Sequence, residues 1–282
     1  MSDDVIIGIE GPVARIRFNR PEKKNALTYA MQAKILAFLD EAEADDDVRV
    51  VVFDSSGADF CSGHDLSEVG GGLSEVDAEG NRRRASQRKR LNADRQYIGF
   101  FRRIFEFSKP TVAIVRGYCL GAGLYMAESV DYLIADDSAR MGHPEQRYGL
   151  SGAAYLQLWE IMTLGARRAR ELLLLGEIWD AATAREYGLI NRVVPAAELE
   201  QAAAAVLDKI TRLPRDGVAV GKASTLNCYD ALGMLSQFLM GPVYHTLSTN
   251  MRWEPDEQNF LKIKSKDGVS SLNKKRSEFY KD

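Results

Sequence analysis

The sequence is poor in cysteine, has no long apolar run and carries little net charge, and each of these features excludes a class of protein. Its three cysteines, Cys61, Cys119 and Cys228, include no Cys-x-x-Cys pair, which argues against a disulfide framework or a zinc site and favours reduced thiols. No stretch approaches the ~18 consecutive apolar residues of a membrane span, and the acidic first residues are not a signal peptide. The net charge of −3 favours neither nucleic acid nor an anionic membrane. We therefore expect a cytoplasmic protein without a membrane partner.

Apolar sequence, in contrast, is ample. Of the 282 residues, 45% are hydrophobic, which suits a folded protein with a sizeable core. Residues 5–10 and 13–18 flank a Gly-Pro turn and predict a hairpin, and the valines of 48–53 predict a strand covered on both faces. A strand, a glycine turn and a helix are predicted in this order at 48–65 and again at 111–127. Helices between strands indicate an α/β architecture.

The chain changes character near Pro195. Beyond it the sequence is almost wholly helical, with 199–213 and 230–240 as the clearest pieces. We therefore predict a core over residues 1–195 that carries the functional site and a helical region over residues 196–282. Such a region either makes oligomer contacts or packs back onto its own core.

A basic segment follows the glycines at 70–72. It permits two interpretations: a solvated, partly helical loop, or a basic arm that touches phosphate. The absence of interleaved aromatic residues weakens a role in RNA binding. The basic residues are Arg82, Arg83, Arg84, Arg88, Lys89, Arg90 and Arg95.

Two glycine turns, residues 59–66 and 116–124, each follow a predicted buried strand. Small residues in such turns let the backbone approach a ligand closely. Two N–H groups that converge on one point form an oxyanion hole, typically worth a few kcal/mol per donor in a transition state. Glycine turns after strands are also common in ordinary structure, so this pattern leaves both interpretations open.

The chain resembles the crotonase (enoyl-CoA hydratase/isomerase) superfamily. Five motifs carry the resemblance in order and spacing, and together they cover nearly the whole chain: residues 20–27, 60–66, 117–123, 142–145 and 188–195. The resemblance implies a spiral core of repeated ββα units and a C-terminal helical region that builds trimers, often paired into hexamers. It also implies an acyl-CoA substrate, with no cofactor besides the coenzyme A of that substrate and no metal.

Positions that match the family's motifs acquire expected roles from the resemblance. The backbone N–H groups of His64 and Ala122 are the two expected oxyanion donors, whereas the imidazole of His64 has no required role. The expected contacts with coenzyme A come from Lys23, Lys24, Ser62, Asp65, Leu66 and, from the same or a neighbouring subunit, Lys275.

One departure from the family pattern concerns the carboxylates. The family's hydratases use two glutamates; here the first position holds Tyr125 and the second holds Glu145. Glu145 is the expected acid and base, and Tyr125 is either a hydrogen-bond donor or a wall of the pocket. Glu128 lies one helical turn beyond Tyr125, further from the expected oxyanion site. His143 is expected to have a structural or supporting role.

These residues predict an enzyme of the enoyl-CoA hydratase/isomerase type that stabilises a thioester enolate, with Glu145 transferring the proton at C2. A single glutamate suffices to move a proton between C2 and C4, and hydration by Glu145 alone is equally compatible with the sequence. Two alternatives remain: hydrolysis of a C–C bond in a cyclic β-keto acyl-CoA, and a non-catalytic relative that binds CoA or RNA.

Overall fold

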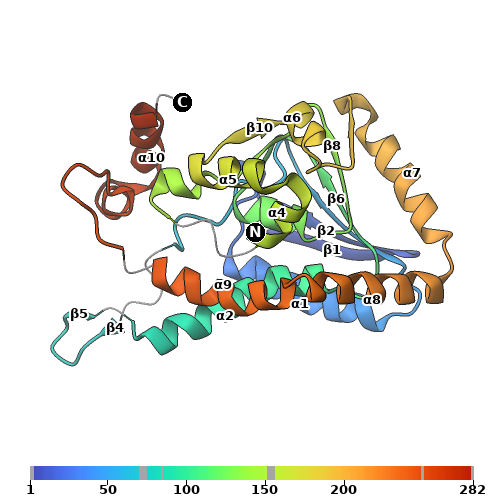
Figure 1. The fold of residues 1–282 in the computed structure, drawn as a ribbon, viewed down its shortest axis with the longest axis horizontal. Helices are drawn as coiled ribbons and strands as arrows, with labels where there is room; N and C mark the ends of the chain where they lie inside the picture. The colour runs from blue at the N-terminus through green and yellow to red at the C-terminus, as the bar shows by residue number, and fades with distance from the viewer. Residues whose placement is uncertain (1–2, 70–74, 84, 151–155, 249–250, 281–282) are drawn as a thin grey trace.

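A six-stranded sheet lies at the centre of the molecule (Figure 1). The strands follow the order β1-β2-β3-β6-β8-β11; β1 and β2 are antiparallel, and the pairs from β2 to β11 are parallel. Their bounds are Val5–Glu10 (β1), Val13–Phe18 (β2), Val50–Ser55 (β3), Thr111–Val115 (β6), Tyr132–Asp136 (β8) and Arg192–Val194 (β11). The computed structural model describes residues 3–69, 75–83, 85–150, 156–248 and 251–280.

Both faces of the central strands are covered, as the valine run predicts. Val50 and Val52 pack in one apolar cluster with Leu199 of helix α7 (Leu199–Thr211). Val51 and Phe53 pack on the opposite face, in the larger cluster that includes helix α1 (Tyr29–Ala44). This alternation follows from the two-residue period of a strand. The predicted hairpin of β1 and β2 is confirmed, with Val5 opposite Phe18.

A smaller sheet extends the fold toward the candidate site. Its order is β10-β9-β7, with bounds Ile178–Asp180, Arg140–Gly142 and Tyr118–Leu120. Strands β6 and β7 and helix α3 (Ala122–Glu128) form one ββα unit, and β8 and β9 begin the next. The predicted α/β fold with a C-terminal helical region is confirmed. A further pair, β4 (Glu75–Val76) and β5 (Arg82–Arg83), stands apart.

Helices begin and end where local chemistry favours it. Thr28 caps α1 by accepting a hydrogen bond from the N–H of Met31 at 3.2 Å, and Ser86 caps α2 in the same way. The remaining bounds are Gln87–Phe105 (α2), Gln157–Leu164 (α4), Ala166–Leu175 (α5), Ala181–Glu186 (α6), Arg215–Ala231 (α8), Met234–Ser248 (α9) and Phe260–Tyr280 (α10), with short 3-10 turns η1 (Pro21–Lys23), η2 (Pro144–Tyr148) and η4 (Ala196–Glu198).

One predicted helical piece is wrong in its extent. The stretch 230–240 is not continuous, because α8 ends at Ala231 and α9 begins at Met234. Gly233 lies between them with φ of 105°, a conformation that interrupts a helix and that glycine adopts without strain. The apolar pattern runs across this break, which is why it suggested one helix.

The C-terminal region contacts its own core as well as solvent. Helix α9 packs on α2, where His245 Nδ1 lies 2.9 Å from Asp94 Oδ1. Much of the basic segment belongs to α2, in which Arg88, Lys89 and Arg95 are exposed. This agrees with the partly helical, solvated interpretation; residues 70–74 and Arg84 lie outside the described residues. Among the described helices, none has the length and apolar character needed to cross a bilayer.

Candidate active site

The first glycine turn is tied to the loop after β2 by backbone hydrogen bonds. Leu27 donates its N–H to the carbonyl of Gly63 at 2.8 Å and accepts the N–H of Asp65 at 2.9 Å. His64 lies between these two partners, so its own N–H points away from Leu27. Gly63 has φ of 105°, which a residue with a Cβ rarely adopts. The turn therefore presents the N–H of His64 on the side away from the loop.

The second turn meets the first at its glycines. Ala122 is the first residue of α3, so its N–H has no acceptor within the helix. A Cβ built on Gly63 would lie 3.8 Å from the nitrogen of Ala122, and one on Gly121 would lie 3.9 Å from the Cα of Gly63. The two expected donor groups thus belong to backbones in direct contact.

Glu145 is brought to the same place by η2. Pro144 opens this turn, which follows β9 directly. A Cβ on Gly121 would lie only 2.8 Å from Glu145 Oε1, so the carboxylate reaches the residue that precedes Ala122. The side chain is 20% exposed, so it is partly open to a substrate. The carboxylate of Glu145 and the two glycine turns therefore lie next to one another.

Tyr125 occupies a different setting from a solvent-facing phenol. Its side chain is 1% exposed, and its ring stacks on the imidazole of His143 with 4.1 Å between ring centroids and 26° between planes. It also meets Phe101 edge to face at 6.0 Å. The ring of Tyr125 is thus buried and packed on the imidazole of His143.

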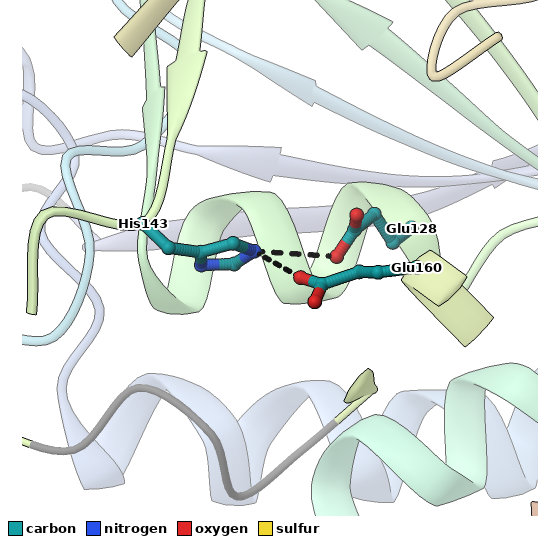
Figure 2. A group of neighbouring side chains, drawn as sticks. All are labelled: Glu128, His143 and Glu160. Atoms are coloured by element: carbon teal, nitrogen blue, oxygen red, sulfur yellow. Dashed lines mark ion pairs between the residues drawn. The ribbon is translucent and has the colours of Figure 1, made fainter. Parts of the chain in front are cut away.

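Glu128 is turned toward a buried cluster. Its Oε2 lies 3.6 Å from His143 Nε2, and Glu160 Oε1 lies 2.7 Å from the same nitrogen (Figure 2). On the other side of the ring, His143 Nδ1 lies 3.8 Å from Glu145 Oε2. The cluster is therefore connected to the candidate catalytic carboxylate through one imidazole.

Burial and charge act strongly in this cluster. Burial and the neighbouring Glu160 carboxylate raise the pKa of Glu128 to about 7, against the opposing effect of His143. Burial opposes a charge on His143, but Glu160 and the other carboxylates raise its pKa well above the usual value. At His64 the balance is reversed, because burial, aided by His245, lowers the pKa of this imidazole to about 4.

The expected CoA residues other than Lys275 lie in or beside the first turn. Lys23 and Lys24 are exposed, and Lys24 Nζ lies 4.2 Å from the ring centroid of Tyr118. Ser62 donates its N–H to the carbonyl of Lys24 at 3.0 Å. Leu66 follows in the same turn and is partly buried. The bond between Lys24 and Ser62 thus joins the loop after β2 to the first turn.

Asp65 is engaged within the chain. Its Oδ2 accepts a hydrogen bond from Arg20 at 3.1 Å. Burial alone would raise the pKa of Asp65, but hydrogen bonds from Ser67 and Arg20 bring it below the usual value. Its described contacts indicate that the carboxylate stabilises the turn.

The described contacts of Lys275 lie within α10, where its Nζ pairs with Asp267 at 2.9 Å. A different lysine of that helix lies beside the segment that follows the turn: Lys264 hydrogen-bonds to the carbonyl of Val69, and burial lowers the pKa of its amine against the opposing effect of Asp65. Sequence reasoning did not identify Lys264, nor Glu160 of the buried cluster. Neither lies in a motif, and only the docking of α10 and α4 shows where they are.

Taken together, the fold and the two turns define an α/β protein whose site suits the stabilisation of an oxyanion and the transfer of a proton. Comparisons with known proteins agree. The profile of the family described as enoyl-CoA hydratase/isomerase matches residues 8–232. A putative enoyl-CoA hydratase of Thermus thermophilus is 32% identical over 203 residues, which cover 72% of this chain and 76% of that protein. The enoyl-CoA delta isomerase 2 of Rattus norvegicus is 29% identical over 78% of this chain and 54% of its own.

Solved structures give the same result. An enoyl-CoA hydratase/isomerase from Xanthobacter autotrophicus Py2 superposes with a TM-score of 0.83 at 28% identity, covering 99% of this chain and 98% of that one. An enoyl-CoA hydratase from Mycobacterium smegmatis gives 0.82 at 26% identity, covering 98% and 94%. The chain belongs to the enoyl-CoA hydratase/isomerase family.

Proposed function

We propose that this protein binds an acyl-CoA, holds its thioester oxygen between the N–H groups of His64 and Ala122, and moves a proton at C2 with Glu145. The observation that carries the proposal is the proximity of Glu145 Oε1 to Gly121, where an added Cβ would lie only 2.8 Å from this oxygen, because it puts the carboxylate beside the donor turn. Removal of a C2 proton places negative charge on the thioester oxygen, where two backbone donors are most effective.

Double-bond isomerisation is the reaction that this arrangement supports best. Glu145 takes a proton from C2 of a 3-enoyl thioester and returns it to C4, so one carboxylate completes the cycle without another acid. Tyr125 stands where a second glutamate would deliver water, and Glu128 is turned into the buried cluster.

Hydration of a 2-enoyl thioester by Glu145 alone is the second candidate. What favours it is the naming of relatives, because the Thermus thermophilus protein is named a putative enoyl-CoA hydratase and the Mycobacterium smegmatis structure an enoyl-CoA hydratase. Here Glu145 deprotonates the water and then delivers that proton to C2.

The surface around the first turn is the proposed place for coenzyme A. Lys23, Lys24 and Ser62 border it, and Leu66 offers apolar contact to the pantetheine. We also infer a contact between Lys264 and a phosphate of CoA, because this amine lies beside the turn. Lys275 remains a candidate of the same kind, from this chain or from a neighbouring copy.

Self-association through residues 196–282 is part of the proposal, as a trimer or a pair of trimers. Helices α8 and α9 expose large apolar side chains, of which Val220 is 70% and Leu247 65% exposed. An exposed apolar surface of this kind typically forms an interface with another protein chain. Light scattering coupled to size exclusion is expected to give three or six times the chain mass; a monomer at micromolar concentration would overturn this part.

The reaction is tested by mass spectrometry in D2O. The panel is a 2-enoyl-CoA, a 3-enoyl-CoA and a cyclic β-keto acyl-CoA, with Glu145→Gln as the matched variant, which keeps shape and removes the base. Bond migration without added water is expected from the wild type and not from the variant, and deuterium enters at C4 to the extent that Glu145 exchanges its proton with solvent before returning it. Gain of one heavy water would establish hydration instead, and ring opening would establish C–C hydrolysis. Equal inactivity of both proteins on every substrate would refute the role of Glu145.

A further inference from the structure

The buried cluster of Glu128, His143 and Glu160 has more polar atoms than the described chain satisfies. The three residues are between 0% and 4% exposed. Both carboxylate oxygens of each glutamate and both ring nitrogens of His143 lack a hydrogen-bond partner of acceptable geometry among the described residues. Buried polar groups are nearly always satisfied, and a set left unpaired in a folded protein requires an explanation, such as an ion.

The charges in the cluster indicate which kind of group would compensate them. If both glutamates are ionised and His143 is protonated, one negative charge remains buried, which is costly in an apolar interior. Either a proton shared within the cluster or a bound cation removes it. A divalent cation beside a neutral imidazole would balance both carboxylates completely.

The two distances from the imidazole nitrogen of His143 fit a metal ion. His143 Nε2 lies 2.7 Å from Glu160 Oε1 and 3.6 Å from Glu128 Oε2, and ligand atoms of all three residues lie within 4.8 Å of one another. For metal–ligand bonds of about 2.1 Å, two ligand atoms at angles of about 80–120° are separated by about 2.7–3.6 Å. Figure 2 shows the two carboxylates and the Nε2 side of the imidazole turned toward one another.

The donor set narrows the kind of metal. One imidazole nitrogen with carboxylate oxygens, and no thiolate, suits first-row divalent ions that accept mixed nitrogen and oxygen ligands. We propose that Glu128, His143 and Glu160 bind one such ion, Zn²⁺ or Mn²⁺, in the core behind the candidate active site. The three residues lie in three elements: the end of α3, the residue before η2, and α4.

The ion would also act on Glu145, a consequence that rests on the proposed function. A histidine that binds a metal through one ring nitrogen commonly donates its other N–H to a carboxylate. His143 Nδ1 faces Glu145 Oε2 at 3.8 Å, and the Tyr125 ring stacked on the imidazole holds its plane. A metal at Nε2 would keep the proton at Nδ1 and so orient the carboxylate of Glu145. His143 is then a positioning residue.

Binding is measured on tag-free full-length protein, stripped with a chelator and titrated separately with Zn²⁺ and Mn²⁺. We expect about one ion per chain by elemental analysis after desalting, and a rise of the melting temperature with metal concentration, because an ion that binds only the folded state stabilises it. Replacement by Co²⁺ is expected to give visible absorption bands of a nitrogen- and oxygen-ligated ion.

The variants Glu160→Gln and Glu128→Gln keep the shape of the side chain and remove its charge. Each is expected to weaken binding by at least ~100-fold, since even outer partners of metal ligands affect affinity by 10–100-fold. Glu106→Gln, in a partly exposed glutamate that pairs with Arg102, is the matched control and is expected to bind as the wild type does.

Each outcome decides the proposal. One ion per chain with binding lost in both cluster variants supports it. A wild type that keeps less than a tenth of an ion and melts at the same temperature with and without metal overturns it, and so does equal binding by wild type and cluster variants. If the variants do not fold, the Co²⁺ spectrum and the melting temperature of the wild type still decide. Loss of deuterium exchange at C2 on metal removal would show that the ion acts on Glu145. Metal binding without such a loss leaves the proposed metal site intact and excludes only its effect on the reaction.

Discussion

Replacement of Gly121 by alanine tests the geometry on which the proposed reaction depends. The added Cβ would lie 2.8 Å from Glu145 Oε1, and ordinary van der Waals contact begins near 3.4 Å, so the carboxylate must move by roughly 0.6 Å. A misplacement of about 1 Å costs a reaction on the order of 100-fold, so we expect kcat to fall by about 10–100-fold, with a smaller change in KM.

The same substitution also has a cost in stability. Gly121 has φ of 51° and ψ of −119°, a conformation that L-residues rarely adopt. We expect the free energy of unfolding to fall by about 1–3 kcal/mol, measured by urea denaturation. The matched control is Gly99→Ala in α2, where the added Cβ meets no atom within 4 Å. This control is expected to keep full activity and to gain about 0.5–1 kcal/mol.

A double-mutant cycle then separates the two possible causes of lost activity. The assay is uptake of deuterium at C2 by wild type, Gly121→Ala, Glu145→Gln and the double variant. If Gly121→Ala acts by displacing Glu145, it adds little in the Glu145→Gln background. A folded Gly121→Ala protein with the wild-type rate would refute the placement of Glu145, and full additivity would show that the substitution acts on the donor turn instead.

Three further predictions concern the loops around the site. Asn25→Ala is expected to lower the free energy of unfolding by about 3 kcal/mol, because its buried amide makes three hydrogen bonds of about 1 kcal/mol each; urea denaturation measures this, and a change below 1 kcal/mol would contradict it. His64→Gln keeps the backbone N–H and is expected to retain C2 exchange within about 10-fold. Because burial lowers the pKa of His64 to about 4, stability that is present above the unfolded value near 6.5 is lost as pH falls toward 4, and denaturation across this range should show a shallower loss in the variant. Lys264→Ala is expected to raise KM for an acyl-CoA about 3–10-fold at low salt without changing kcat, and equal KM values at every salt concentration would exclude a phosphate contact.

Local pattern was sufficient for the elements whose residues decide their own structure. The hairpin of β1 and β2 and strand β3 follow from alternation and a valine run, both of which act within a few residues. The break at Gly233 shows the limit of such reasoning. An apolar pattern continues across it, and the backbone conformation of the glycine decides where the helix ends.

The candidate site likewise has residues that a local pattern identifies and residues that only the fold identifies. Glu145 and the two glycine turns were identified from motifs, because a turn that approaches a ligand requires particular small residues at particular positions. Tyr125 was recognised as a departure, but its packing against His143 required the fold. Lys264 and Glu160 belong to no motif, so nothing near them in the sequence indicated a role.

The sequence by itself therefore determined the family, the α/β class and the position of one candidate catalytic carboxylate, because these depend on short-range spacing that can be recognised without knowledge of packing. Only the tertiary structure brought Glu128, His143 and Glu160 together. They lie 15 and 17 residues apart, and each by itself has the pattern of an ordinary polar residue. Whether a glutamate is solvated or buried beside another charge depends on how distant helices pack, and that packing decides its pKa and its ligands.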